Sequence, residues 1–176
     1  PCVFPTTKFV VAPDVKKLTF NPAPEDIIIF VSKPAVTYAA QAFDLTQFES
    51  QFVAVGQGTA ALLQQVGVKQ VTSPEQHNSE GMLQLSELQH VKNKTIYIVR
   101  GQDGRELLAQ ALTERGALIQ YVEVYQRHCA SPDAAILQNA CAKKLDAIVA
   151  TSRSSLENLL KLATPQTRAI LQKTPV

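Results

Sequence analysis

The sequence has no tryptophan, few other aromatic residues and only a small excess of positive charge. Aromatic side chains make up 6% of the 176 residues, and the formal net charge is +2. A nucleic-acid partner calls for a basic patch or for aromatic side chains that stack on bases, so we expect none here. No apolar run approaches the roughly 18–20 residues that cross a bilayer, so we expect no membrane partner.

Cysteine and the common catalytic motifs are equally scarce. The cysteines are odd in number and lack Cys-x-x-Cys spacing, which is typical of reduced thiols in a cytoplasmic protein. The three histidines lack metal-ligand spacing, and neither a Walker nor a Gly-x-Ser-x-Gly pattern occurs. We therefore expect no metal site. The cysteines are Cys2, Cys129 and Cys141.

Short apolar runs alternate with stretches of helical periodicity. The runs are continuous, which is typical of strands covered on both faces in a parallel sheet. Leucine and alanine recur at helical spacing between them, as in Leu107–Leu112 and Leu156–Ala163. This repeated β-α order predicts an α/β fold with parallel sheets. The expected strands include 27–31, 52–55, 95–99 and 147–150.

Capping residues predict where several helices begin and end. Ser154 and Asp103 each precede a glutamate by three residues, and Thr164 precedes a proline, so all three are expected helix starts. Gly67 and Gly116 follow helical stretches and precede apolar residues, which is typical of helix ends.

Two apolar segments, Cys2–Val11 and Leu118–His128, are longer than the usual strand of about five or six residues. We interpret them as paired linker strands that carry the chain into one domain and back out. The prediction is two parallel-sheet β-α domains, one inserted in the other and joined by a two-stranded linker ladder. The inserted domain would span residues 8–122, and residues 1–7 and 123–176 would form the linkers and an incomplete second domain.

Ligands of open α/β sheets bind where strands hand over to helices, at the carboxyl ends of the strands. These handovers carry small or hydroxyl residues, and each offers the free N–H groups of a helix start, which bind anions. Cations lie at the same edge, so we expect several anion sites facing one cleft and a ligand with many carboxylates or phosphates. Helix capping alone is the alternative at any single turn. The cations are Lys33, Arg100, Arg105 and Arg153.

The stretch FVAVGQGTAALL, residues 52–63, leaves two interpretations open. Gly56, Gly58 and Ala61 fit the G-x-G-x-x-A fingerprint of dinucleotide-binding folds. That fingerprint expects an acidic residue at the end of the next strand, about 20 residues later, whereas Glu75 follows Pro74 in a polar loop. The turn is therefore either a weak dinucleotide motif or a cradle for other acids.

Several stretches together resemble the uroporphyrinogen-III synthase family. They are IIIFVSKPAV, FVAVGQGTAALL, the SEG of residues 79–81, IYIVRGQDGRELLAQALTERGA, VEVYQRH and DAIVATSRSSLENL. The most specific are the turn from Arg100-Gly101 to Arg105-Glu106 and the step Val124-Tyr125. They occur in order along nearly the whole chain. The resemblance implies two α/β domains joined by a two-stranded ladder.

The resemblance also implies an activity. Members of this family are lyases that take hydroxymethylbilane, a polycarboxylated linear tetrapyrrole, remove water and close the ring with the last pyrrole inverted. They need no cofactor, and we expect a monomer. Tyr125, placed on the second linker strand and facing the cleft, is the candidate catalytic residue. Candidate substrate-binding residues are Ser32, Lys33, Gly56, Gly58, Thr59, Arg100, Gly101, Arg105 and Ser152.

Other readings of the same residues remain. The chain could be a nucleotide- or dinucleotide-binding α/β domain, or a synthase-like protein that binds tetrapyrroles without turnover. Tyr125 could be an aromatic residue that only packs between the domains. The family's opening strand and helix and its closing Gly-x-x-Thr turn have no counterpart in the sequence, which leaves half of the second domain's binding wall unaccounted for.

Overall fold

A computed structural model describes residues 1–102, 106–143 and 145–176. Contacts divide the chain into two compact units, Val10–Gln126 and Pro1–Phe9 with Arg127–Val176. Among the described residues, no helix is long and apolar enough to cross a membrane. The domain limits predicted from the sequence stay a prediction.

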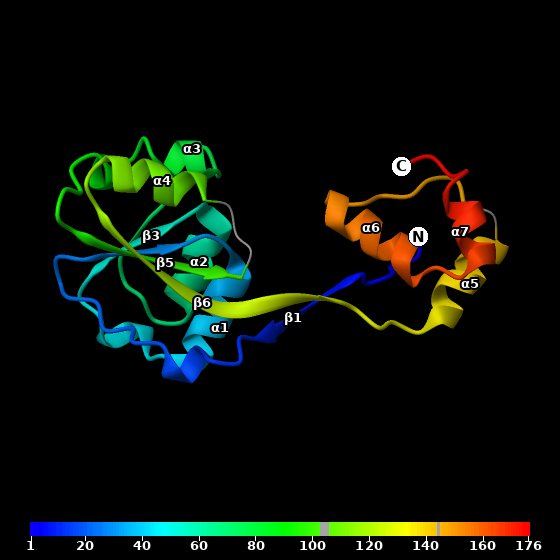
Figure 1. Cartoon of the computed structure of the whole chain (residues 1–176), viewed down its shortest axis with the longest axis horizontal. Coiled ribbons are helices and arrows are strands. Elements are labelled where there is room, and N and C mark those ends of the chain that lie inside the picture. Colours follow the sequence, from blue (N-terminus) through cyan, green and yellow to red (C-terminus); the bar gives the residue numbers. More distant parts are fainter. Residues whose placement is uncertain (103–105, 144) are drawn as a thin grey trace. The chain divides into compact units, whose positions relative to one another are not determined.

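A six-stranded sheet in the order β1-β6-β5-β2-β3-β4 organises the larger unit (Figure 1). The pairs β2–β3, β2–β5, β3–β4 and β5–β6 are parallel, which confirms the predicted α/β class. The second long apolar segment forms one strand over its whole length, whereas the first forms a strand only from Thr7. The strands are β1 (Thr7–Val11), β2 (Ile27–Phe30), β3 (Gln51–Ala54), β4 (Val71–Thr72), β5 (Thr95–Gly101) and β6 (Leu118–Cys129).

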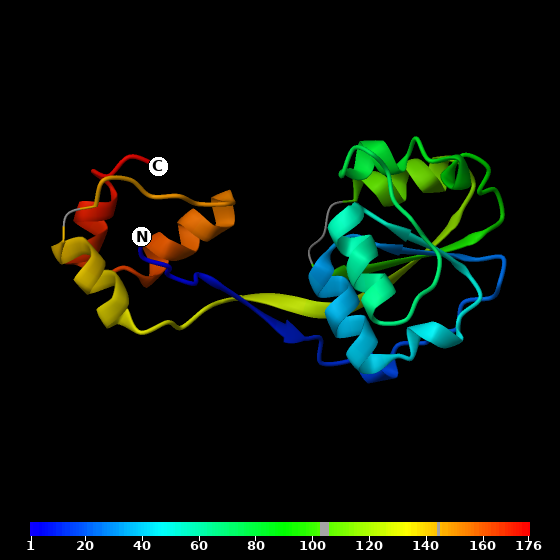
Figure 2. The same ribbon diagram turned by 180° about the vertical axis from the view of Figure 1, so that it is seen from behind.

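Both faces of this sheet are covered, because successive side chains of a strand point to opposite faces. In β2, Ile28 and Phe30 pack beneath α1 (Lys33–Ala42) and α2 (Gln57–Gln65). Ile27 and Ile29 pack on the other face, beneath α3 (Ser79–Met82) and α4 (Leu107–Glu114). Figure 2 shows α1 and α2 together on one side of the sheet. The continuous apolar runs are thus explained by a core on each face.

Several helix ends lie at the capping residues and glycines that the sequence predicts, among the residues that the structure describes. Thr164 caps its helix as predicted, with its hydroxyl accepting a hydrogen bond from the Thr167 N–H. Gly67 and Gly116 have φ of +100° and +85°, as expected of the left-handed residue after a helix. Asp103 lies outside the described residues. Three short 3-10 turns complete the unit: η1 (Val15–Lys17), η2 (Leu45–Gln47) and η3 (Ser86–Leu88).

The smaller unit consists of three helices and extended segments. Its core combines α5 (Ala134–Ala142), α6 (Arg153–Leu162) and α7 (Pro165–Leu171) through apolar residues of each helix and the connection after α6. The predicted helix start at Ser154 is wrong by two residues, because Ser152 accepts the capping hydrogen bond from the Ser155 N–H. The core residues are Leu137, Cys141, Leu159, Ala163 and Leu171.

The predicted strand at residues 147–150 does not form among the described residues. In this segment the Ile148 N–H donates a backbone hydrogen bond to the Pro175 carbonyl at 2.7 Å. The Val149 side chain is 92% exposed. A strand requires a ladder of such bonds with a neighbour, and one bond does not make a ladder. Apolar composition predicted a strand here, but composition does not supply a partner.

Candidate functional site

The carboxyl ends of β2, β3 and β5 lie next to one another at one edge of the sheet. Phe30 is in register with Ala54 on one side and Val99 on the other. The Val31 N–H donates to the Val99 carbonyl, and the Val55 N–H donates to the Phe30 carbonyl. Three of the predicted turns, beginning at Ser32, Gly56 and Arg100, therefore follow adjacent strand ends. Parallel alignment of the strands produces this juxtaposition.

Ser32 connects β2 to α1 and holds the start of that helix. Its Oγ accepts a hydrogen bond from the Ala35 N–H at 3.2 Å, and the following Lys33-Pro34 places proline in the first turn. The same Oγ lies 3.2 Å from the hydroxyl oxygen of Tyr125. Two candidates that are 93 positions apart in the sequence are thus hydrogen-bonded to each other.

Tyr125 lies in the core of the larger unit, with 1% of its surface exposed. The prediction that it faces an open cleft is therefore wrong. A bulge in the β5–β6 ladder explains its position, since Arg100 is in register with Glu123 whereas Gly101 is in register with Tyr125. The extra residue places both Val124 and Tyr125 in the core beneath α1.

Gly101 gives the Tyr125 ring its space. A Cβ at this glycine would lie 2.4 Å from the ring, closer than any real carbon contact. The Gln102 N–H donates to the Tyr125 carbonyl at 3.0 Å, and the ring of Tyr38 lies 5.8 Å from the Tyr125 ring. Gly101, assigned from the sequence to substrate binding, thus contacts the candidate catalytic residue.

Gly56, Gly58 and Thr59 form the start of α2. Gly56 is the N-cap residue and, because it has no side chain, leaves the helix start without a side-chain capping bond. Thr59 is buried in the first turn. Lys33 from the neighbouring turn lies over Gly58, because a Cβ there would be 3.2 Å from the lysine Nζ. His77 lies over Gly56, with its ring 2.8 Å from the corresponding point. The first-turn N–H groups thus have two basic side chains beside them.

His77 is not among the site residues predicted from the sequence, where it is only one of three histidines that lack metal-ligand spacing. Its exposed polar loop, residues 73–79, carries no local pattern that points to Gly56. Only the packing of that loop against the end of β3 brings the imidazole to the glycine turn. The signal that could have found it is the loop's position after a strand of the same sheet, β4.

Arg100 is not an open anion site. Its side chain is 6% exposed and forms ion pairs with Glu106 at 2.9 Å and with Glu123 at 3.7 Å. Its guanidinium also lies 4.4 Å from the ring centre of Tyr121, a cation–π contact. The predicted assignment of Arg100 to substrate binding is therefore corrected in one respect: its positive charge is already paired with two carboxylates.

The same cluster shifts two pKa values. The pKa of Glu106 is lowered by the hydrogen bond from the Tyr121 hydroxyl and then by that from Arg100. The pKa of Tyr121 is raised by burial and then by the bond to Glu106. A carboxylate is thus held ionised at the start of α4.

The remaining candidates lie elsewhere. Arg105 falls outside the described residues. Ser152 belongs to the smaller unit, where it caps α6 and is exposed. A common cleft that joins Ser152 to the turns of the larger unit stays a prediction. Within the described ranges, no group of three or more His, Cys, Asp or Glu side chains could hold a metal ion.

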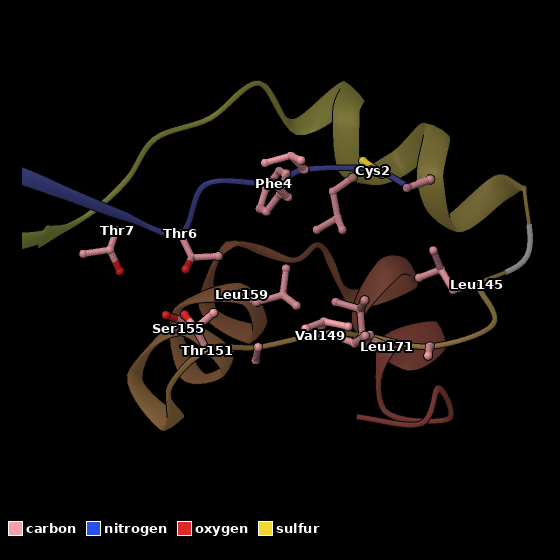
Figure 3. A pocket seen from close by; sticks show the side chains of 16 residues that line it. Cys2, Phe4, Thr6, Thr7, Leu145, Val149, Thr151, Ser155, Leu159 and Leu171 are labelled. Carbon is pink, nitrogen blue, oxygen red and sulfur yellow. The ribbon is translucent and has the colours of Figure 1, made fainter. Parts of the chain in front are cut away.

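A cavity of about 480 Å³ lies in the smaller unit (Figure 3). It is bordered by the N-terminal segment around Phe4, the segment around Val149, and helices α5 to α7. Among the residues that the structure describes, its lining is mostly apolar and includes no lysine or arginine. A polycarboxylated ligand would lose hydration there without gaining a cation, so this cavity is not the predicted anion site.

Comparison with known proteins gives one consistent family. A family model described as uroporphyrinogen-III synthase HemD matches residues 1–176. The uroporphyrinogen-III synthase of Salmonella typhimurium is 32% identical over 174 residues, covering 93% of this chain and 70% of that protein. That of Proteus mirabilis is 38% identical over 109 residues, covering 58% of this chain and 54% of that protein. The chain thus matches between 54% and 70% of these relatives' length.

Solved structures agree on the fold. Uroporphyrinogen-III synthetase from Helicobacter pylori has a TM-score of 0.65 at 18% identity, covering 90% of this chain and 70% of that one. A mutant uroporphyrinogen III synthase from Thermus thermophilus has a TM-score of 0.63 at 18% identity, covering 98% of this chain and 72% of that one. At such identity the likeness establishes the fold.

Proposed function

The chain belongs to the uroporphyrinogen-III synthase family, and we propose that it catalyses the family's reaction. Hydroxymethylbilane loses water and closes to uroporphyrinogen III with inversion of the last pyrrole ring, which makes the enzyme a cyclising lyase of tetrapyrrole biosynthesis that needs no cofactor. The family match over residues 1–176 carries the proposal. The monomeric state and the cytoplasmic location stay predictions from the sequence.

The geometry of the larger unit supports this substrate class. The turns after β2 and β3 each begin a helix, and carboxylates bind first-turn N–H groups that have no partner within a helix. In α1 the Ala35 N–H already donates to Ser32 and Pro34 has no N–H, so the start of α2 is the better anion site.

Lys33 adds a flexible positive charge beside Gly58. The Thr59 N–H donates to the Gly56 carbonyl at 3.0 Å, so Thr59 would support the turn. Groups at Ser32 and Gly58 would hold carboxylates of the substrate and fold the linear chain for closure, which is a positioning task. We assign Ser152 a similar role in the smaller unit.

The chemistry asks for little beyond a proton donor. Departure of the hydroxyl from an electron-rich pyrrole gives a stabilised azafulvene cation, and protonation of the leaving oxygen assists it. The Ser32–Tyr125 pair, with 3.2 Å between the hydroxyl oxygens, is the proton-bearing group that we assign to this step.

The test is the isomer that forms from fresh hydroxymethylbilane in the presence of the full-length protein. After oxidation, chromatography separates the type III porphyrin from type I, which forms spontaneously. We expect mostly type III. Type I alone, at the spontaneous rate, would contradict the enzymatic proposal.

The glycine turn also fits a nucleotide, so binding must be tested separately. A thermal shift with NAD or ATP would favour the nucleotide-binding alternative, and we expect no shift with either. A response to the tetrapyrrole without formation of type III would identify a binding protein that lacks turnover.

A further inference from the structure

We propose that the Ser32 hydroxyl, rather than that of Tyr125, touches the departing hydroxyl of the substrate and gives it a proton. Tyr125 then acts behind Ser32 as the residue that orients the serine hydroxyl and resupplies its proton. This inference rests on the proposed function and assigns the parts of its proton transfer. The assignment follows from the number of hydrogen bonds that the Ser32 hydroxyl can make and from the different burial of Ser32 and Tyr125.

The Ser32 oxygen has one proton to donate and two lone pairs to accept with. The Ala35 N–H occupies one lone pair at 3.2 Å. When the Tyr125 hydroxyl donates across its 3.2 Å contact, it occupies the second lone pair. The proton of Ser32 is then left to point away from both partners, toward a ligand at the turn.

Burial separates the two hydroxyl groups in the same way. Tyr125 is 1% exposed and belongs to the core between the sheet and α1. Ser32 is partly exposed at the carboxyl end of β2, and its neighbour Lys33 is exposed. A bound substrate can therefore reach Ser32 without disturbing the core, whereas contact with Tyr125 would require the core to open.

The position of Tyr125 is fixed from several sides. The bulge at Arg100/Gly101 directs its side chain into the core, and Gly101 leaves space for the ring. The Gln102 N–H holds its carbonyl at 3.0 Å. Such fixed geometry suits a group that must keep one hydrogen bond in one direction.

The step balances as follows. The C–O bond of the hydroxymethyl group breaks, and its electron pair leaves with the oxygen while the pyrrole nitrogen stabilises the cation. The oxygen takes the Ser32 proton and departs as water, and the Tyr125 proton moves to Ser32. The pyrrole carbon that forms the new bond later loses its proton to the Ser32 oxygen, while the Ser32 proton moves back to the Tyr125 oxygen across their 3.2 Å contact. The net change is loss of one water from the substrate.

The test compares S32G, S32T, Y125F and the double variant S32G/Y125F in the full-length protein. Glycine caps helices nearly as well as serine does, so S32G removes the hydroxyl with little loss of stability. S32T keeps the hydroxyl. Y97F is the matched control, because Tyr97 is also a largely buried tyrosine of this core.

We expect S32G to lower kcat for type III formation on the order of 10²-fold, as is typical for loss of a general acid. S32T should restore kcat to within about tenfold of the wild type, and Y97F should leave it unchanged. Y125F should lower kcat alone, but the double variant should be no slower than S32G, because Tyr125 acts only through Ser32.

Two results would overturn the assignment. Wild-type kcat in S32G would remove Ser32 from the proton transfer. A double variant slowed by the product of both single effects would mean that Tyr125 reaches the substrate independently. Both results are read on a wild type that forms type III, so they differ from failure of the proposed function, in which the wild type forms only type I.

Discussion

At the scale of single residues, chemically similar side chains at one sheet edge have different uses. Arg100 and Lys33 both carry a positive charge next to a strand end. Arg100 is buried between Glu106 and Glu123, whereas Lys33 is exposed and lies over Gly58. A cation that already has two carboxylate partners gains little from a third, so of these two cations Lys33 is the one available to a substrate.

Gly58→Ala tests the proposed carboxylate cradle without damaging the fold. The added Cβ meets only the flexible end of Lys33, 2.8 Å from its Cε, and alanine is favoured over glycine in a helix by about 0.5–1 kcal/mol. The free energy of unfolding should be unchanged or raised. KM for hydroxymethylbilane should rise about tenfold, because alanine keeps the backbone N–H but its Cβ displaces the Lys33 ammonium from the turn, and a bond to a charged group contributes roughly 1.5–3 kcal/mol.

Urea denaturation and steady-state kinetics measure these two effects. Gln57→Ala, at the exposed position one residue earlier, is the matched control and should change neither quantity. If G58A kept the wild-type KM, the glycine turn would not contact the substrate.

At the scale of elements, the β5–β6 pair both builds the sheet and positions the site. Its regular register runs from Thr95 with Leu118 to Arg100 with Glu123, and the bulge then brings Gly101 opposite Tyr125. Directly beside the bulge, Arg100, Tyr121 and Glu106 connect both strands to the start of α4. The polar cluster therefore fixes the place where the ladder departs from regularity.

Glu106→Gln tests this cluster through pH. Because the folded pKa of Glu106 lies below its ordinary value of 4.5, its ionised form stabilises the fold at pH values above that range. The stabilisation is lost as pH falls through the lowered pKa. The wild type should therefore be more stable than E106Q at pH 7, and the difference should shrink as the pH falls below the ordinary glutamate pKa of 4.5.

Urea denaturation at several pH values gives this difference directly. Glu157→Gln is the control, because Glu157 pairs with an Arg153 side chain that is 92% exposed, and such surface pairs contribute about 0–1 kcal/mol. A stability difference for E106Q that did not change with pH would mean that the ionisation of Glu106 does not contribute to stability and that only its hydrogen-bonding pattern does.

At the scale of the whole molecule, the two units differ in the size of their buried cores. The larger one has a core on each face of its sheet, with fully buried residues in both. Among its described residues, the smaller one has a cluster of five buried residues and a mostly apolar cavity of about 480 Å³. Buried apolar area is the main source of stability, so the larger unit holds most of it.

A fragment of residues 10–126 should therefore fold without the rest of the chain. We expect native-like circular dichroism and one cooperative transition in urea, because both of its cores are internal to it. Gradual unfolding without a transition would show that residues outside the fragment are needed for its folding. Leu63→Ala in the same fragment is the control, since it opens the core and should lower the midpoint by the equivalent of about 2–5 kcal/mol.

The α/β class, three of the four expected buried strands and the turns at their ends could be predicted from the sequence alone, whereas anion binding at these turns stays a prediction. These features follow from continuous apolar runs and from capping chemistry, both of which act over a few residues. Family resemblance added the candidate residues Ser32 and Tyr125. The tertiary structure decided what the sequence could not, because each case depends on a partner distant in the chain: Arg100 is paired, Tyr125 is buried against Ser32, His77 lies over Gly56, and residues 147–150 lack a strand ladder among the described residues.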